Sequence, residues 1–190
     1  MRIVISEFMS LDGVVQAPGG PEEDTDGGFA HGGWSVPYFD PEVIGGTIGA
    51  KFATVEALLF GRRTFQGMAA AWPERAGDPF ADQMNAIDKH VVTSTLSADD
   101  ITWPNSYVIP ADGALDAIAE LRGRDGGDLA VMGSATLARS LLQAGQLELV
   151  DHQVASTGVI VCTYRPTGAN VATGSSDEFY EDPAEPPVSP

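Results

Sequence analysis

The sequence predicts an α/β domain, in which a mostly parallel β-sheet carries helices on its faces and ends in an antiparallel hairpin. Short apolar runs rich in β-branched residues alternate with segments of helical periodicity, a pattern typical of parallel sheets. The last two apolar runs, 147–155 and 159–165, are separated only by Ser156-Thr157-Gly158, which indicates a hairpin. No run of about 18 apolar residues occurs, so we expect a soluble chain without a membrane span.

In the first half of the chain, the apolar run at 2–8 predicts a strand, followed by the turn Leu11-Asp12-Gly13. The glycine-rich, acidic stretch 17–33 is typical of a surface loop. A helix is expected from Asp40 to Phe52, because Asp40 is a good N-cap and proline follows at the first helical position. The next predicted elements are a strand at 56–60, a helix at 64–71, a helix near 80–87 and a strand at 89–93.

In the second half, the same pattern predicts a strand at 106–109, a helix at 114–122, a strand at 128–132, a helix at 135–144 and the hairpin. Beyond Pro166 the chain consists mainly of Gly, Ser, Pro, Asp and Glu without apolar periodicity. Such a segment buries too little surface to offset its ordering entropy. We therefore expect one domain over 1–166 and a disordered tail over 167–190.

Composition excludes several classes of function. The formal net charge of −17 disfavours nucleic acid and anionic membranes as partners. The single cysteine, Cys162, excludes an internal disulfide, and we expect it to be a small core residue. The three histidines lack metal-ligand spacing, so no metal is assigned. The N-terminus lacks the features of a signal peptide, and a cytoplasmic protein is expected.

Three segments following predicted strands have the residues of an anion site. In parallel sheets, ligands bind at the carboxyl ends of strands, where helix N-termini offer backbone N–H groups and a favourable dipole. Each segment alone also suits ordinary turn and cap chemistry, but together they indicate a phosphate-bearing dinucleotide. Two of the ten Lys and Arg residues lie in the first segment. The segments are Gly61-Arg62-Arg63-Thr64, Thr93-Ser94-Thr95 and Gly133-Ser134-Ala135-Thr136-Leu137.

These segments belong to a series of motifs that runs in order through residues 1–166. The motifs are Met9-Ser10-Leu11-Asp12-Gly13, Leu59-Phe60-Gly61-Arg62-Arg63-Thr64-Phe65, Lys89-His90-Val91-Val92-Thr93, Val131-Met132-Gly133-Ser134 and the closing stretch from Ser156 to Pro166. In these motifs the chain resembles the dihydrofolate reductase superfamily, and especially its branch that is similar to the reductase domain of bacterial riboflavin biosynthesis. The resemblance implies a dihydrofolate-reductase-like fold, NADPH as cofactor, a small-molecule substrate and a homodimer.

The resemblance also implies roles for individual residues. It places the diphosphate at the Arg62-Arg63-Thr64 and Gly133-Ser134 helix starts, the adenosine phosphate near 93–96, and Ala17 at the cofactor. It places substrate between the first loop and the first helix, near Trp34, with Asp12 and Asp40 as candidate catalytic groups. A buried carboxylate at Asp40, with its pKa raised by desolvation, can help to protonate a C=N or C=O group. The alternatives are a plain turn residue for Asp12 and a plain N-cap for Asp40.

One departure from the family pattern concerns the segment after the Gly133-Ser134 helix. The family continues with a strand of Val-Asp-Glu-Leu type and a glycine-rich turn, whereas here 138–146 leads straight into the hairpin at Leu147-Glu148-Leu149-Val150-Asp151. We therefore expect one family strand, beside the first strand, to be absent. Its loss exposes backbone hydrogen-bonding groups unless the hairpin pairs there instead.

The expected function is an NADPH-dependent reductase resembling 5-amino-6-(5-phosphoribosylamino)uracil reductase, which transfers hydride to a small heterocycle or carbonyl. The preference for NADPH rests on Arg62, Arg63 and the hydroxyls at 93–95, which suit a 2′-phosphate. Two alternatives remain open: a dihydrofolate reductase proper, and a non-catalytic dinucleotide-binding or assembly protein, which the absent strand favours.

Overall fold

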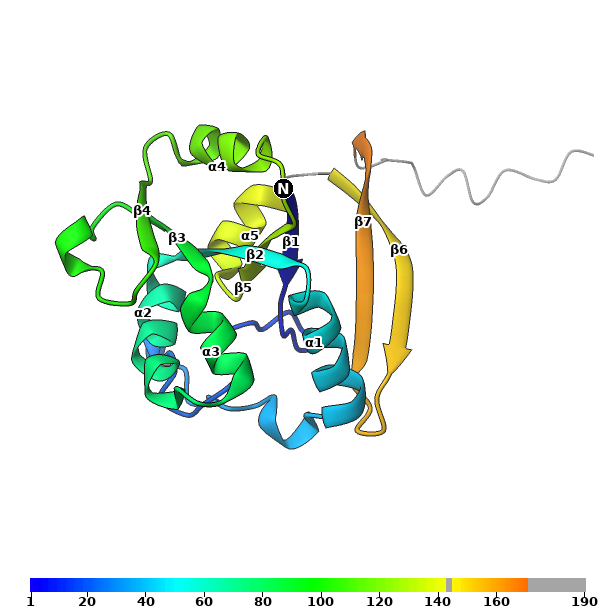
Figure 1. The fold of residues 1–190 in the computed structure, drawn as a ribbon. Coiled ribbons are helices and arrows are strands. Elements are labelled where there is room, and N and C mark those ends of the chain that lie inside the picture. The colour runs from blue at the N-terminus through cyan, green and yellow to red at the C-terminus, as the bar shows by residue number, and fades with distance from the viewer. Residues whose placement is uncertain (143–144, 171–190) are drawn as a thin grey trace, which may run out of the picture.

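A five-stranded parallel sheet forms the centre of the protein (Figure 1). The computed structural model describes residues 1–142 and 145–170. The strands lie in the order β1-β5-β2-β3-β4, and each neighbouring pair is parallel. They are β1 (Arg2–Ser6), β2 (Val55–Gly61), β3 (Asp88–Thr93), β4 (Ser106–Pro110) and β5 (Asp128–Met132). The predicted α/β class is therefore confirmed.

The helices follow the predicted order, with ends that shift by a few residues. The helix expected from Asp40 begins as a short π-helical turn, Pro41–Gly45, before continuing as an α-helix. Residues 143–144, the expected end of the last helix, lie outside the described residues. The α-helices are α1 (Gly46–Phe52), α2 (Arg62–Ala71), α3 (Pro79–Ala86), α4 (Ala114–Arg122) and α5 (Ala135–Leu142). None of the helices in the described part of the chain has the length and hydropathy needed to cross a bilayer.

Two apolar layers cover the two faces of the sheet. Side chains alternate along a strand, so Leu58 and Phe60 of β2 face one layer while Ala57 and Leu59 face the other. The first layer contains residues of α1, α2 and α3, and the second contains residues of α4 and α5. Because both faces are covered, β2 is buried along most of its length. The sheet therefore leaves only its strand ends and edges for a site.

A buried lysine of β3 connects the end of α3 to the loop that precedes β4. Lys89 has no exposed surface, and its Nζ donates hydrogen bonds to the carbonyls of Asn85, Ile87 and Pro104 at 2.6–3.0 Å. The same ammonium lies 4.5 Å from the ring centroid of Trp103. All three ammonium protons thus have acceptors, and the residue is explained by the fold alone.

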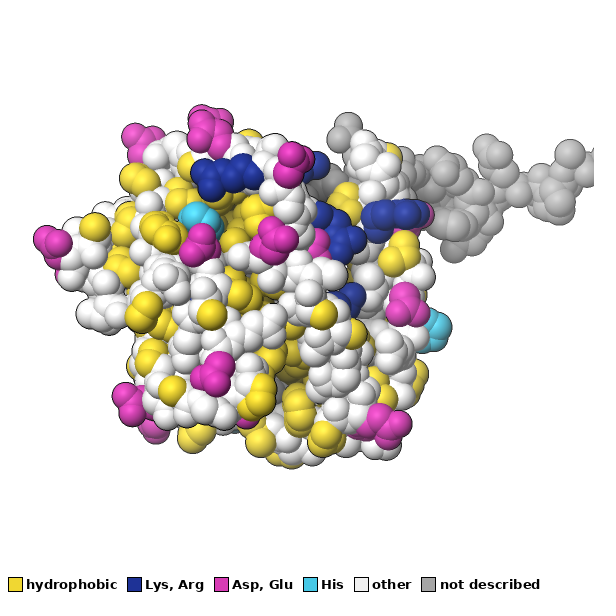
Figure 2. Space-filling view, viewed as in Figure 1, with side chains coloured by type: hydrophobic (Ala, Val, Ile, Leu, Met, Phe, Trp, Pro, Cys, Tyr) yellow, Lys and Arg dark blue, Asp and Glu magenta, His cyan; other side chains and the backbone are white. Residues whose placement is uncertain are grey.

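The C-terminal hairpin forms a second sheet and does not replace the absent strand. Strands β6 (Gly145–Val154) and β7 (Ile160–Asn170) pair antiparallel with each other in a sheet of their own, so the alternative in which the hairpin pairs with β1 is not found. Within the described residues, β1 has β5 as its only strand partner. Apolar side chains lie at the surface of the hairpin (Figure 2). Six of them are each more than 40 % exposed: Leu147, Leu149, Val150, Val154, Ile160 and Tyr164.

Two expectations about the C-terminal part need correction. Cys162, expected in the core, is exposed, because no further layer of the described chain covers β7. The strand continues to Asn170, so β7 includes residues 167–170, which were assigned to the tail. The remainder of that tail, 171–190, lies outside the described residues.

Candidate functional site

The three predicted anion-binding segments lie side by side at the carboxyl edge of the sheet. They follow β3, β2 and β5, which are adjacent strands in the order β1-β5-β2-β3-β4. All five strands are parallel, so their carboxyl ends share this edge. Ligands of open parallel sheets bind at such an edge, where helices begin.

The starts of α2 and α5 are in direct contact. The backbone N–H of Gly61 donates a 2.9 Å hydrogen bond to Ser134 Oγ. A Cβ atom on Gly133 would lie 3.2 Å from Thr64 Cγ2, which is tighter than ordinary van der Waals contact. Glycine at 133 therefore allows the two helix starts to approach each other closely.

The backbone at the start of α5 has an unusual conformation. Gly133 and Ser134 both have a φ of 63°, in the left-handed region. Glycine adopts this conformation readily, but for serine it costs roughly 1–2 kcal/mol. Such strain clusters at ligand-binding sites, where the surrounding contacts maintain it. Of the other predicted residues here, Ala135 and Thr136 begin the helix, and the Leu137 side chain packs against the core.

The two arginines at the start of α2 have different partners. Arg62 donates a 2.9 Å hydrogen bond to Gln66 one turn along the helix. Arg63 pairs with Asp26 at 2.5 Å, and both side chains of this pair are about 60 % exposed. Asp26 belongs to the glycine-rich acidic loop 17–33, so that loop reaches the start of α2. The first turn of α2 has no side-chain cap, which leaves its N–H groups available to an anion.

The hydroxyl segment after β3 borders a small cavity. Thr93 is buried, and its Oγ1 accepts hydrogen bonds from the N–H groups of Thr95 and Leu96, both at 3.1 Å. Ser94 and Thr95 are exposed. A cavity of about 320 Å³ lies at the ends of β3 and β4, lined by Thr93, Ser94, Leu96, Val108, Pro110, Ala111 and Asp112. The Thr93 hydroxyl therefore holds the turn, while its neighbour Ser94 lines the cavity.

Three predicted residues of the first loops are held by local contacts. Trp34 Nε1 donates a 2.9 Å hydrogen bond to the carbonyl of Gln16. Ala17 is buried with a φ of 46°, and its carbonyl accepts from Gly33 N at 2.8 Å. Asp12 is exposed, and a 2.6 Å hydrogen bond from Ser10 Oγ lowers its pKa. This geometry matches the alternative interpretation of Asp12 as a turn residue.

The expectation that burial raises the pKa of Asp40 is wrong. Asp40 is buried, but its Oδ1 accepts from the N–H groups of Glu42 and Val43, and its Oδ2 accepts from Ser156 N and Oγ. These hydrogen bonds, first that from Val43, lower the pKa of the carboxyl. Asp40 is thus an ionised N-cap that also holds the hairpin turn. In the described part of the chain, no hydrogen bond or ion pair joins Asp12, Trp34 and Asp40 to one another.

The sequence interpretation missed one acidic residue at this edge, Glu7. It follows β1 directly, and its Oε1 is a buried atom with no hydrogen-bond partner among the described residues. Desolvation raises the pKa of Glu7 to about 7. The signal in the sequence is an acidic residue inside an otherwise apolar strand run, at the position where parallel strands present their ligands.

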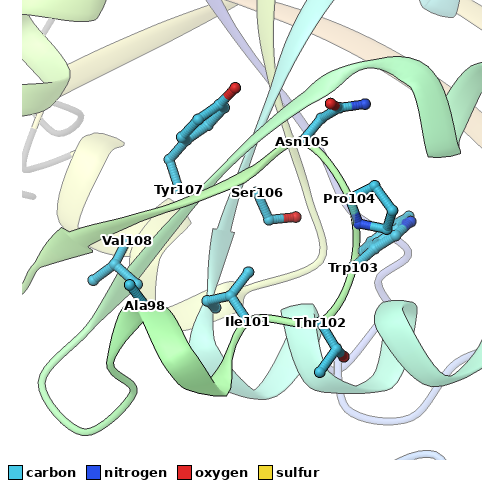
Figure 3. A pocket seen from close by; sticks show the side chains of 9 residues that line it. All are labelled: Ala98, Ile101, Thr102, Trp103, Pro104, Asn105, Ser106, Tyr107 and Val108. Carbon is cyan, nitrogen blue, oxygen red and sulfur yellow. The ribbon is translucent and has the colours of Figure 1, made fainter.

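A second cavity, of about 460 Å³, lies away from these residues (Figure 3). It is formed by the loop before β4 and by β4 itself, which is an edge strand of the sheet. Figure 3 shows Ser106 in its middle, and the Ser106 Oγ is buried without a partner in the described residues. None of the predicted cofactor or substrate residues lines this cavity, so its volume alone does not make it the candidate site.

Comparisons with known proteins bear on the family and the fold of this chain. The RibD C-terminal domain family matches residues 2–156 of the chain. No curated protein matches it at a significant level. A crystal structure of a Shewanella sp. PV-4 protein that is assigned to riboflavin biosynthesis superposes with a TM-score of 0.62. The sequences are 15 % identical, and the match covers 88 % of this chain and 99 % of that one, so the fold is shared.

Proposed function

This chain belongs to the RibD C-terminal domain family, and on that premise we propose that it is an NADPH-dependent reductase. The observation that carries the proposal is the contact between the starts of α2 and α5, where Gly61 N binds Ser134 Oγ. This contact joins two helix N-termini at neighbouring strand ends. Each N-terminus alone favours an anion, and together they form one combined site. A dinucleotide diphosphate, with a negative charge on each phosphate, has the chemistry that such a double site favours.

The residues present fit NADPH. Gly133 leaves open the space that a Cβ would fill beside Thr64, and the first turn of α2 has no side-chain cap. Arg63 already pairs with a carboxylate, so its guanidinium is positioned to receive an anionic group. The cavity beside Ser94 offers room for the adenosine part. Bound NADPH would supply the hydride, and the chain would orient it.

For the substrate, we propose 5-amino-6-(5-phosphoribosylamino)uracil or a related small heterocycle. The support is membership of the RibD C-terminal domain family and the shared fold with a protein assigned to riboflavin biosynthesis. Exposed apolar side chains near the first loop, Phe8, Met9 and Leu11, suit a flat ring system. A non-catalytic dinucleotide-binding protein is the second candidate, because the hairpin lies apart from β1 and leaves that strand at the sheet edge.

The cofactor proposal is tested by thermal-shift titration with NADPH and NADH. A ligand at 100 times its Kd stabilises the fold by about 2.7 kcal/mol, which the melting curve resolves. We expect a larger shift with NADPH, and a loss of that difference in Arg63→Ala. Arg122→Ala is the matched control, because Arg122 is exposed at the end of α4, away from the carboxyl edge. A cooperative melt that neither dinucleotide shifts would refute the proposal.

The catalytic proposal is tested by NADPH oxidation with a panel of uracil and pteridine compounds, including 5-amino-6-(5-phosphoribosylamino)uracil. Oxidation that depends on one of these compounds supports a reductase and identifies its substrate class. Binding of NADPH without oxidation by any of them selects the non-catalytic alternative.

A further inference from the structure

The strand order gives a bound dinucleotide a direction along the carboxyl edge. The predicted adenosine segment follows β3, and the two diphosphate segments follow β2 and β5. The next strand in the sheet is β1. Adjacent strands lie about 4.8 Å apart, so β3 and β1 are separated by roughly 14 Å. A dinucleotide with its adenosine at β3 and its diphosphate at β2 and β5 therefore carries its nicotinamide to the end of β1.

Glu7 is the residue that β1 presents at this point. The carbonyl of the preceding Ser6 accepts a 3.3 Å hydrogen bond from Gly133 N, so the end of β1 lies beside the start of α5. Ser6 pairs in register with Met132. The Glu7 Oε1 atom is buried and has no partner among the described residues, whereas Met9, two residues later, is 67 % exposed. The residue at the end of β1, where the nicotinamide is expected, thus carries a buried acidic oxygen that has no hydrogen-bond partner among the described residues.

The charge state of Glu7 differs from that of Asp12 and Asp40, the two carboxyls that the sequence singled out as candidate catalytic groups. Desolvation is the cause of its raised pKa of about 7, and no charged side chain contributes to the shift. A large fraction of Glu7 is therefore protonated at neutral pH. Hydrogen bonds lower the pKa of Asp12 and Asp40, so both are carboxylates that have no proton to give.

We propose that Glu7 is the proton donor of the reductase, a role that rests on the proposed function. Hydride adds to the carbon of a C=N or C=O bond, and the π electron pair moves to the nitrogen or oxygen. That atom takes the proton from the Glu7 carboxyl, which becomes a carboxylate and regains a proton from water. The substrate gains two electrons and two hydrogens, and NADPH is oxidised to NADP⁺. Glu7 thereby has the role first expected of Asp40.

The test that does not depend on turnover is a carboxyl ¹³C NMR titration of Glu7, with the signal assigned by its loss in Glu7→Gln. The free protein is expected to titrate near 7. The oxidised nicotinamide is a cation, so NADP⁺ should lower the pKa of Glu7 by about one unit relative to NADPH. Equal pKa values in the two complexes would overturn the placement of Glu7, while leaving the cofactor proposal intact. A chain that binds neither dinucleotide overturns the reductase function, and the role of Glu7 with it.

The kinetic test uses the compound that the wild type reduces in the panel above. Glu7→Gln should lower kcat by about 10²- to 10⁴-fold with an unchanged Kd for NADPH, and Glu7→Asp should restore part of the rate. In the wild type kcat should fall as pH rises through 7, and the variant should lose this dependence. The control is Glu120→Gln on the exposed side of α4. A Glu7→Gln protein with wild-type kcat and pH profile would refute the proposal.

Discussion

The N–H of Gly61 and the hydroxyl of Ser134, 73 residues apart in sequence, are joined by a 2.9 Å hydrogen bond. The bond connects the end of β2 to the start of α5, and so fixes the position of one helix N-terminus relative to the other. A site assembled in this way is formed before a ligand arrives, which reduces the entropy lost on binding.

Ser134→Ala should destabilise the protein by about 1–2 kcal/mol. The substitution leaves Gly61 N without its partner and keeps a Cβ in the left-handed region. Ser134→Gly should cost less, because glycine releases the backbone strain. Urea unfolding of the two variants measures both effects, and thermal shift with NADPH should show weaker binding for each. An alanine variant as stable as the wild type would contradict the importance of this bond.

Gly133→Ala should be more damaging than Gly158→Ala, although both glycines have positive φ values, 63° and 87°. A Cβ at 133 meets Thr64 at 3.2 Å, whereas a Cβ at 158 has nothing within 4 Å. The shared backbone strain, roughly 1–2 kcal/mol, therefore cancels in the comparison. Chemical denaturation measures the loss of stability in both variants, and NADPH titration measures the loss of affinity. The difference between the variants reports the contact with Thr64, because the backbone strain is common to both. Equal losses of stability and affinity would show that the Thr64 contact is unimportant.

Asp26→Asn should tighten NADPH binding by about 1.5- to 5-fold. Asp26 pairs with Arg63 at the start of α2. An exposed pair of this kind contributes about 0.2–1 kcal/mol, which is lost when a cofactor phosphate displaces Asp26 from Arg63. The gain should shrink at high salt, because the ions screen the pair. Glu22→Gln, in the same loop and exposed, is the control. Isothermal titration in low and high salt measures the change, and tighter binding in both variants would indicate a general charge effect.

The parts of the site that the sequence predicted are those set by local chemistry. Glycine, serine and arginine at strand-to-helix junctions are recognisable at Gly61 and Gly133, because the turn and the helix start lie within a few residues. The signal at Glu7, an acidic residue in an apolar run, does not show that its side chain is buried, since its burial depends on how segments distant in sequence pack around the end of β1. The error at Cys162 has the same origin: alternation in a strand shows which residues share a face, but not whether another layer covers that face.

Asp40 shows how a correct local prediction leads to an incorrect chemical one. The N-cap was evident from Asp40-Pro41-Glu42, but the hydrogen bonds from Ser156 come from a turn 116 residues away. Together with the N-cap bonds they stabilise the ionised form and lower its pKa. We therefore assign the role of proton donor, first expected of Asp40 because of its burial, to Glu7, whose Oε1 accepts no such hydrogen bonds among the described residues.

Asp40→Asn should lower the melting temperature but retain turnover. The Asp40 carboxylate connects the first helix to Ser156 in the hairpin turn, and an amide cannot accept all four hydrogen bonds. Since its folded pKa is depressed, this stabilisation is present above the usual pKa of an aspartate and is lost as pH falls through the folded value. A double-mutant cycle with Ser156→Ala measures the coupling. A folded, NADPH-binding Asp40→Asn protein without turnover would assign Asp40 a direct role in catalysis.

Glu7→Gln should make the protein more stable at pH 8 and flatten its stability between pH 5 and 8. The folded pKa of Glu7, about 7, lies above its usual value of 4.5, so the folded state binds the proton more tightly than the unfolded chain. The resulting stabilisation is complete below pH 4.5 and is lost as pH rises through 7. A shift of this size corresponds to about 3 kcal/mol, which we reduce to about 1–2 kcal/mol because the side chain is partly accessible to solvent. Urea unfolding of both proteins from pH 5 to pH 8 provides the measurement, with Glu120→Gln as the control for an exposed carboxylate. Parallel stability curves for the wild type and Glu7→Gln would mean that Glu7 is ionised in the folded protein at pH 5, which is incompatible with its role as a proton donor near neutrality.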